Sequence, residues 1–106
     1  MKNYPVYLST IAEFKLVKVL EYILQEFGLA SREKFLKKFK ENIKKISSNP
    51  LSCPESELDG IYKNVVTKQT SFYYRILNQE IEIVTITDNR QNPKSIYKEL
   101  EKLALT

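Results

Sequence analysis

Two side chains near the C-terminus have the chemistry to act on a phosphate group. Arg90 lies in the polar stretch DNRQNP, just past the end of a predicted strand, and Tyr97 follows in a predicted helix. A guanidinium stabilises negative charge that develops on a scissile phosphate, and a tyrosine or lysine can relay the proton of an attacking ribose hydroxyl. Metal-free RNA cleavage is therefore one hypothesis. In the structural alternative, Arg90 pairs with Asp88 or a sheet carboxylate, and Tyr97 packs between helix and sheet.

The stretch TKQTSFYYRI, residues 67–76, is a second candidate site because it mixes aromatic with polar side chains. Side chains alternate between the two faces of a strand, so Tyr73 and Arg75 share the face opposite to Phe72. If helices cover the Phe72 face, the other face is open, and a nucleic acid base can stack or hydrogen-bond there. The alternative is a partly exposed sheet with long amphipathic side chains and no ligand. The candidate binding residues of this stretch are Lys68, Gln69, Tyr73 and Arg75.

A basic helix face is the third candidate. The segment 31–46 carries seven basic residues, interrupted by two glutamates: Arg32, Lys34, Lys37, Lys38, Lys40, Lys44 and Lys45. Most charged helix faces are simply hydrated, and only a basic face aligned with an open side of the sheet would bind a polyanion. Hydrated surface is the simpler interpretation of this segment.

The composition excludes several classes of enzyme. The chain of 106 residues contains no histidine, one cysteine (Cys53) and two glycines. The absence of histidine excludes Ser-His-Asp and Cys-His nucleophilic arrangements and, with a single cysteine, the common zinc sites. Two glycines cannot build a P-loop or a GxGxxG fingerprint. We therefore expect no metal and no cofactor, and any catalysis would use Lys, Arg, Tyr, Asp or Glu.

Charge and hydropathy indicate a cytoplasmic protein with an anionic partner. The net charge of +4 favours nucleic acid or an acidic protein as that partner. The N-terminal sequence lacks the apolar region of a signal peptide, and no segment reaches the roughly 18 apolar residues of a membrane span. A single cysteine also rules out an internal disulfide, which fits a reducing compartment.

Hydrophobic periodicity predicts one α+β domain over residues 1–106. The predicted order is β-α-α-β-β-β-(α), with a mostly antiparallel sheet and a helical hairpin on one of its faces. Nine apolar residues between Phe14 and Phe27 predict a well-buried first helix. Gly28 is its expected C-cap, Ser31 is the expected N-cap of the next helix, and the pair NQ is a hairpin candidate. The predicted strands are 4–9, 62–68, 71–77 and 80–87, and the predicted helices are 10–27, 31–46 and one that follows Pro93.

Four segments of the chain carry a resemblance to a known family. YPVYLSTIAEFKLVKVLEYILQEFG, SREKFLKKFKENIKKISSNP, IYKNVVTKQTSFYYRI and EIEIVTITDNRQNPKS resemble the RelE/ParE superfamily, the toxins of type II toxin–antitoxin modules, often labelled plasmid-stabilisation proteins. The most specific parts are VVTKQTSFYYRI and DNRQNP. The ParE-like branch is the most similar, because there too a strand ends in an Asp-Asn-Arg or similar turn before an Asn-Pro or Asp-Pro.

The resemblance implies a small basic toxin that an acidic antitoxin holds inactive in a hetero-oligomer. Such antitoxins wrap a helix and an extended segment around the toxin and sometimes add a strand to its sheet. The targets divide the superfamily. RelE-like toxins cut messenger RNA on the ribosome, whereas ParE-like toxins poison DNA gyrase.

Site residues are also implied by the resemblance. Arg90 matches the arginine that follows the last strand of the cleaving toxins, Tyr97 their terminal tyrosine, and Lys63 a basic position at the start of the hairpin sheet. Ser71 and Asn64 stand where those toxins carry cations, and losing two cations lowers transition-state stabilisation. The turn residues Asn89 and Arg90 are then expected to meet a target or the antitoxin at the edge of the sheet.

Three functional hypotheses follow. The favoured one is a ParE-like toxin that inhibits DNA gyrase without catalysis. The alternative is a RelE-like ribosome-dependent mRNA interferase that uses Arg90, Tyr97 and Lys63. The third is a non-toxic member that only binds its antitoxin.

Overall fold

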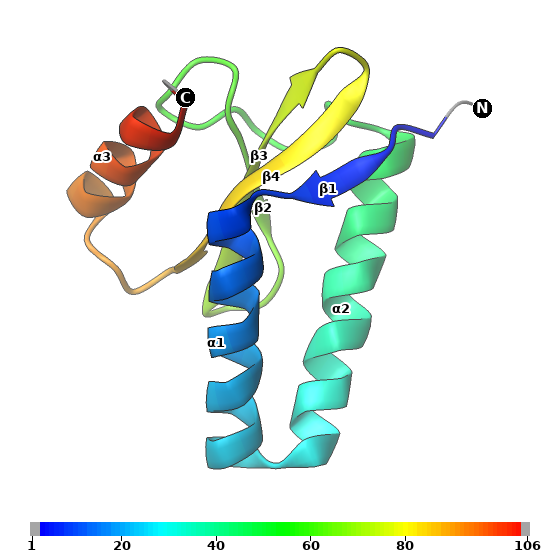
Figure 1. The fold of residues 1–106 in the computed structure, drawn as a ribbon, viewed down its shortest axis with the longest axis vertical. Coiled ribbons are helices and arrows are strands. Elements are labelled where there is room, and N and C mark those ends of the chain that lie inside the picture. Colours follow the sequence, from blue (N-terminus) through cyan, green and yellow to red (C-terminus); the bar gives the residue numbers. More distant parts are fainter. Residues whose placement is uncertain (1–2, 105–106) are drawn as a thin grey trace.

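A four-stranded sheet separates the helices into two layers (Figure 1). The structure is a computed structural model that describes residues 3–104. The strands are β1 (Val6–Leu8), β2 (Tyr62–Val65), β3 (Thr70–Leu77) and β4 (Glu80–Asp88), and the helices are α1 (Thr10–Phe27), α2 (Leu29–Ser48) and α3 (Pro93–Ala104). The sheet order is β1-β4-β3-β2, with β1 parallel to β4 and the other two pairs antiparallel. The predicted α+β class and order of elements are confirmed.

The β3–β4 hairpin turns at the predicted dipeptide and contains one bulge. Asn78 and Gln79 have φ angles of 52° and 65°, the left-handed pair that a two-residue hairpin turn requires. Further along, Tyr73 pairs with Thr85 whereas Tyr74 pairs with Ile83, so Val84 is an extra residue in β4. A bulge of this kind reverses which alternate residues face each side of the sheet. Consequently Ile81 and Ile83 before the bulge and Ile86 after it all join the same core.

The main core lies between the α1–α2 hairpin and one face of the sheet. Phe39 of α2 packs edge-to-face on Phe72 of β3, with ring centroids 5.6 Å apart. Tyr74 is fully buried in the same layer, and its hydroxyl donates to the Pro50 carbonyl at 2.7 Å. Desolvation by burial raises the pKa of this phenol. The buried members of this core are Ala12, Phe35, Phe39, Ile46, Cys53, Val66, Phe72, Tyr74, Ile81, Ile83 and Ile86.

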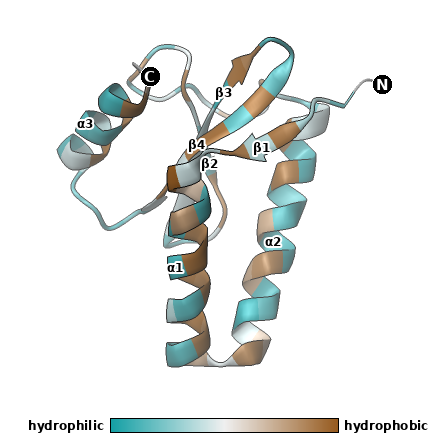
Figure 2. Cartoon of the chain, in the orientation of Figure 1, coloured by the Kyte–Doolittle hydropathy of each residue, from teal (hydrophilic) through white to brown (hydrophobic). Residues whose placement is uncertain are grey.

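The prediction of a well-buried first helix is wrong. Only Ala12 of α1 is fully buried, because the helical hairpin extends well beyond the sheet and its far end has no sheet beneath it (Figure 1). Hydrophobic residues nevertheless continue along α1 to its far end (Figure 2). The side chains left exposed on this helix are Ile11, Phe14, Val17, Tyr22, Leu24 and Phe27.

Gly28 alone forms the corner between the two long helices. Its φ of 92° is the left-handed conformation that favours glycine, and its N–H caps α1 by donating to the Leu24 carbonyl at 3.0 Å. The second helix begins at once, since the Arg32 N–H already donates to the Gly28 carbonyl at 3.2 Å. Ser31 therefore lies inside α2, where its hydroxyl donates to the Phe27 carbonyl at 3.2 Å, and its predicted role as N-cap is wrong.

Helix α3 covers the opposite face of the sheet, which was expected to be open. Ile96 and Leu100 of α3 pack on Tyr73 and Val84 in a second, smaller core. Pro93 is the first helical residue, a position where its missing N–H costs nothing. The expectation that Tyr73 faces solvent is wrong, because its side chain is only 5% exposed.

Candidate functional site

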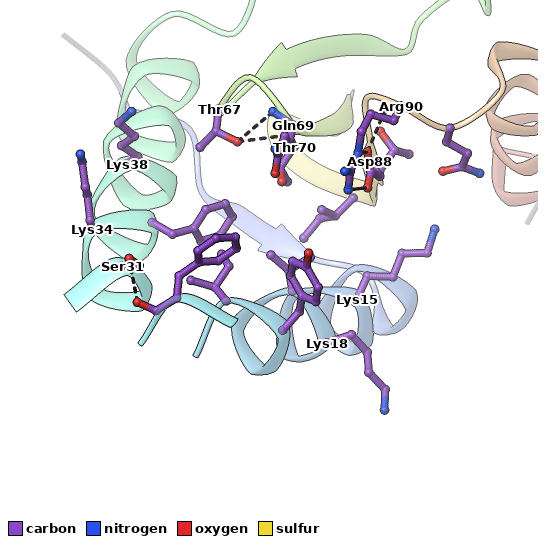
Figure 3. Close-up of a pocket in the computed structure, with 18 residues that line it drawn as sticks. Lys15, Lys18, Ser31, Lys34, Lys38, Thr67, Gln69, Thr70, Asp88 and Arg90 are labelled. Carbon is purple, nitrogen blue, oxygen red and sulfur yellow. Dashed lines mark hydrogen bonds and ion pairs between the residues drawn. The ribbon is translucent and has the colours of Figure 1, made fainter. Parts of the chain in front are cut away.

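A groove lies between the helical hairpin and the end of β4, and we call it the hairpin groove (Figure 3). Its volume is about 580 Å³. Its apolar residues are Val19, Tyr22, Ile23, Phe27, Phe35 and Ile86, and its charged residues are Lys15, Lys18, Lys34, Lys38, Arg90 and Asp88. Five cations therefore surround an apolar floor, with a single carboxylate among them.

Arg90 reaches this groove while bound to Asp88. Arg90 Nε donates to Asp88 Oδ1 at 3.0 Å, Nη2 donates to Oδ2 at 2.7 Å, and the Arg90 backbone N–H donates to Oδ1 at 2.8 Å. These side-chain and backbone hydrogen bonds lower the pKa of Asp88 to about 2. The pair is exposed, with side-chain exposures of 65% for Arg90 and 47% for Asp88. A guanidinium has five N–H donors, so it can still donate to an incoming anion.

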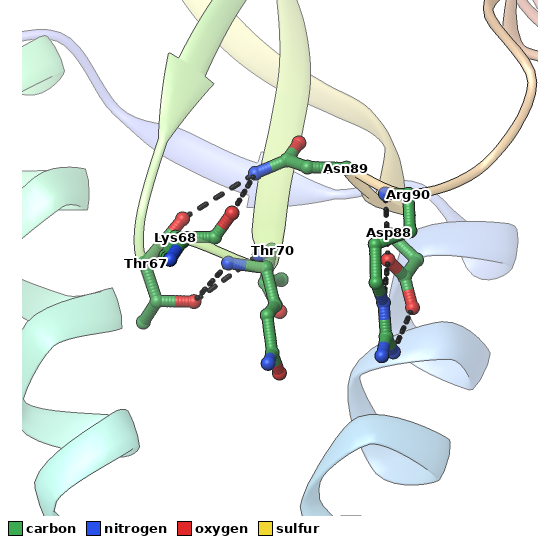
Figure 4. A network of polar contacts seen from close by, with 7 residues as sticks. Thr67, Lys68, Thr70, Asp88, Asn89 and Arg90 are labelled. Carbon is green, nitrogen blue, oxygen red and sulfur yellow. Dashed lines mark hydrogen bonds and ion pairs between the residues drawn. The ribbon is translucent and has the colours of Figure 1, made fainter.

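Asn89 fastens the end of β4 to the β2–β3 turn (Figure 4). Its backbone N–H donates to the Gln69 carbonyl at 2.7 Å, and its side-chain amide donates to the Lys68 carbonyl at 3.0 Å. Ser71 donates to the Asn89 side-chain oxygen at 2.6 Å. Asn89 thus holds the turn that presents Lys68 and Gln69, two exposed residues, and Gln69 lines the hairpin groove.

Lys63 and Tyr97 lie elsewhere, in a second groove that we call the terminal-helix groove. This groove has a volume of about 310 Å³ and runs between α3, the loop before β2 and the sheet. Its lining includes Lys63, Tyr73 and Tyr97, together with the carboxylates of Glu55 and Glu57, but not Arg90. Desolvation by burial raises the pKa of the Tyr73 phenol. The three residues proposed for RNA cleavage are therefore divided between two grooves.

Ser71 and Asn64, the neutral residues at the positions where the resemblance to cleaving toxins implies cations, are both buried. They lie on opposite faces of the sheet, since Asn64 pairs with Phe72, the neighbour of Ser71 in β3. Ser71 is completely buried and bonds to Asn89. Asn64 is 1% exposed, donates to Asn42 Oδ1 of α2 at 3.1 Å and accepts from the Cys53 thiol at 3.2 Å. A charged side chain at either position would lose its hydration unless a new partner compensated for it.

Arg75 is engaged within the fold. Its Nε donates to Glu82 Oε1 at 2.8 Å, and Nη1 donates to the Ala104 carbonyl at the end of α3 at 3.3 Å. Both charged side chains of the pair are 17% exposed. Of the residues proposed to bind a partner, Lys68, Gln69 and Arg90 are exposed, Asn89 and Arg75 are half-buried, and Tyr73 is buried.

The lysines of α1 are groove residues that the sequence reasoning missed. Lys15, Lys18 and Tyr22 recur at i, i+3 and i+7, so they share one stripe of the helix, and all three line the hairpin groove. Lys34 and Lys38 were assigned to a basic helix face, but the folding of the hairpin brings them opposite Arg90 (Figure 3). The stripe on α1 was a usable signal, because Lys15 and Lys18 are the only basic residues of that helix.

Two further features concern the described residues as a whole. Within residues 3–104, no three His, Cys, Asp or Glu side chains form a group that could hold a metal ion. In the same range no helix combines the length and the hydropathy needed to cross a membrane.

Comparison with known proteins agrees with this fold. Among solved structures, the chain is similar to a component of the chromosomal ParDE toxin–antitoxin system from P. aeruginosa, with a TM-score of 0.69 and 18% identity, covering 80% of this chain and 95% of that one. It is also similar to the YoeB dimer from Staphylococcus aureus, with a TM-score of 0.55, 20% identity and coverage of 80% and 95%. The toxin–antitoxin complex RelBE2 from Mycobacterium tuberculosis gives a TM-score of 0.53, 21% identity and coverage of 82% and 99%.

Sequence comparison supplies the family. Curated proteins contain no significant match to this chain. A family model described as the ParE toxin of the type II toxin–antitoxin system parDE, however, matches residues 6–93. Since that match spans most of the 106 residues, the chain belongs to the ParE toxin family of type II toxin–antitoxin systems.

Proposed function

We propose that this toxin acts in the cytoplasm by binding DNA gyrase, that it does not cleave RNA, and that an acidic antitoxin neutralises it. The observation that carries the proposal is the separation of the cleavage candidates. Arg90 lines the hairpin groove and is paired with Asp88, whereas Lys63 and Tyr97 line the terminal-helix groove beside Glu55 and Glu57. Stabilising a scissile phosphate requires cations that converge on one point. The carboxylates beside Lys63 would instead repel the phosphate.

The hairpin groove is the proposed docking site for the antitoxin. Its apolar floor fits the apolar side of an amphipathic segment. Lys18, Lys34 and Lys38, which form no ion pair within the described residues, fit acidic residues along the edges of that segment. Solved neighbours include toxins bound to their antitoxins, such as the RelBE2 complex and the YoeB-YefM complex from Staphylococcus aureus. An antitoxin that fills the groove would also cover Arg90. It would thereby block any contact of Arg90 with the target, and this would neutralise the toxin.

The first experiment measures the target. The purified chain is added to DNA gyrase in a supercoiling assay, and cells are induced to express it and scored for a DNA-damage response against arrest of translation. The expected result is loss of supercoiling or trapped cleaved DNA, with intact messages during growth arrest. Unchanged supercoiling at excess toxin, or growth unaffected by induction, contradicts the proposal, and the second outcome supports the non-toxic member.

The alternative, RNA cleavage on the ribosome, rests on the shared position of Lys63 and Tyr97 in the terminal-helix groove. A double substitution, Lys63→Ala with Tyr97→Phe, separates the two functions. Under gyrase inhibition without RNA cleavage the double variant stays toxic, because the chemistry that these two side chains would supply is then not used. Loss of toxicity together with disappearance of cleaved messages would establish the alternative.

A further inference from the structure

The positive charge of this protein is concentrated in one helix. Helix α2 contains seven basic and two acidic residues, a net charge of +5, compared with +4 for the whole chain. The rest of the chain therefore carries a net charge of −1. An excess of this size on one rigid element makes a local field that attracts polyanions.

The lysines of α2 are available to a partner. All six are exposed, and none of them forms an ion pair with another residue in the part of the chain that the structure describes. Lys34 and Lys38 line the hairpin groove, whereas Lys37, Lys40 and Lys44 do not. These last three recur at i, i+3 and i+7 and so form a stripe along the side of the helix away from the groove. We call Lys37, Lys40 and Lys44 the outer lysine stripe.

No large apolar side chain accompanies the outer lysine stripe. The aromatic residues Phe35 and Phe39 and the aliphatic Ile46 are all buried against the sheet, and none of the large apolar residues of the described chain that are exposed lies between positions 30 and 50. A protein interface needs an apolar centre, in which lysine is depleted, and a membrane-bound helix must insert an apolar face. Neither is offered here. By contrast, α1 exposes Phe14 and Val17, a surface of the kind that suits a protein partner.

We propose that the outer lysine stripe binds the phosphate backbone of nucleic acid without reading its sequence, contrary to the sequence-based interpretation of this helix face as hydrated surface and although the stripe is not aligned with an open side of the sheet. Backbone binding requires only cations held on a rigid element, and this stripe supplies no side chain that distinguishes bases in the way bidentate arginine or asparagine does. Because the stripe lies outside the hairpin groove, a protein in that groove leaves it free. The chain can thus hold nucleic acid and a protein partner at the same time.

The test measures binding of the purified full-length chain to a short mixed-sequence DNA duplex, with an RNA duplex of the same sequence as a second probe. Salt is varied between about 50 and 200 mM, since the logarithm of the affinity falls by about 0.9 per neutralised phosphate for each unit of log salt. The triple variant K37Q/K40Q/K44Q is expected to bind at least tenfold more weakly at low salt and to show a slope smaller by about 2 to 3. Glutamine keeps nearly the helix propensity of lysine, so circular dichroism should confirm an unchanged fold.

A matched variant controls for net charge. K94Q/K98Q/K102Q removes three exposed lysines from α3 and changes the total charge by the same amount. The loss of duplex affinity in this control should be less than a third of the loss in the α2 triple variant. The salt dependence of its affinity should have the same slope as that of the wild-type chain. Equal losses in both triple variants, or full binding by the α2 variant, would overturn the proposal, as would a wild-type chain that binds neither duplex. The proposal would also be overturned if the α2 triple variant kept its binding to the duplexes but lost binding to an acidic protein or an anionic vesicle, because the stripe would then serve another partner. Neither gyrase nor antitoxin is present, so the result does not depend on the proposed function.

Discussion

Arg90 binds both oxygens of Asp88, with Nε 3.0 Å from Oδ1 and Nη2 2.7 Å from Oδ2. The carboxylate fixes the guanidinium at the mouth of the hairpin groove and satisfies part of its charge. A cation held in this way is placed to meet a second carboxylate from a partner, and it lines a different groove from Lys63 and Tyr97. The Asp88–Arg90 contact therefore favours a role of Arg90 in binding a partner over a role in RNA cleavage.

The Asp88–Arg90 contact predicts a titration. Asp88 should titrate near pH 2, and Arg90→Ala should raise its pKa toward the ordinary value of about 3.9. A depressed folded-state pKa stabilises the fold above the unfolded-state pKa, and this contribution is lost as pH falls from about 4 toward 2. Because the pair is exposed, solvent screening should leave its contribution to the free energy of unfolding small. Carboxyl chemical shifts in a pH series measure the pKa; an Asp88 pKa unaffected by Arg90→Ala would contradict the contact.

The hairpin groove predicts how charge reversal affects antitoxin binding. Arg90→Glu should weaken binding of the proposed acidic antitoxin by about tenfold or more, since it places a second carboxylate beside Asp88. Lys94→Glu makes the same change of charge at an exposed position of α3 outside the groove, and its effect should be much smaller. Titration calorimetry of both variants decides the matter: equal weakening would show that only the net charge is recognised.

Glu99 predicts how firmly α3 is attached. Its carboxylate accepts a hydrogen bond from Thr85 of β4 at 2.7 Å and forms an ion pair with Lys15 of α1. Few apolar side chains anchor α3, so we expect it to be the least stable element of the fold. Glu99→Gln should destabilise its docking by about 1 kcal/mol and raise amide exchange in α3 several-fold. Glu101→Gln, at an exposed position of the same helix, is the control; identical exchange in both variants would remove Glu99 from this role.

The uneven burial of the helical hairpin predicts two different costs for one substitution. Phe39→Ala should lower the free energy of unfolding by about 3–5 kcal/mol, because the ring is 3% exposed and packs on Phe72. Phe14→Ala should change it by no more than about 0.5 kcal/mol, because 60% of that residue is exposed. Chemical denaturation of the two variants measures both values, and similar losses would mean that α1 is buried more deeply than described.

Local sequence determined most of the elements of this protein. The alternation in EIEIVTIT, the dipeptide NQ and the position of Pro93 depend on neighbours in the chain, so they predicted β4, its hairpin and the start of α3 correctly. The ParE-like resemblance rested on the same kind of information, since its motifs are short and contiguous. Sequence also indicated that Arg90 has Asp88 as an available partner two residues away.

Tertiary structure decided which surfaces remain accessible. The apolar residues of α1 could not reveal that the helix extends past the sheet, because exposure depends on what lies beneath each turn. Likewise, the face carrying Tyr73 and Arg75 is closed by α3, which comes from a distant part of the chain. The same long-range packing brings Lys15 and Lys34 into the groove that Arg90 lines and places Lys63 and Tyr97 in another groove. Side-chain types specify what each residue can do, but only the packing of remote elements determines which of them act together.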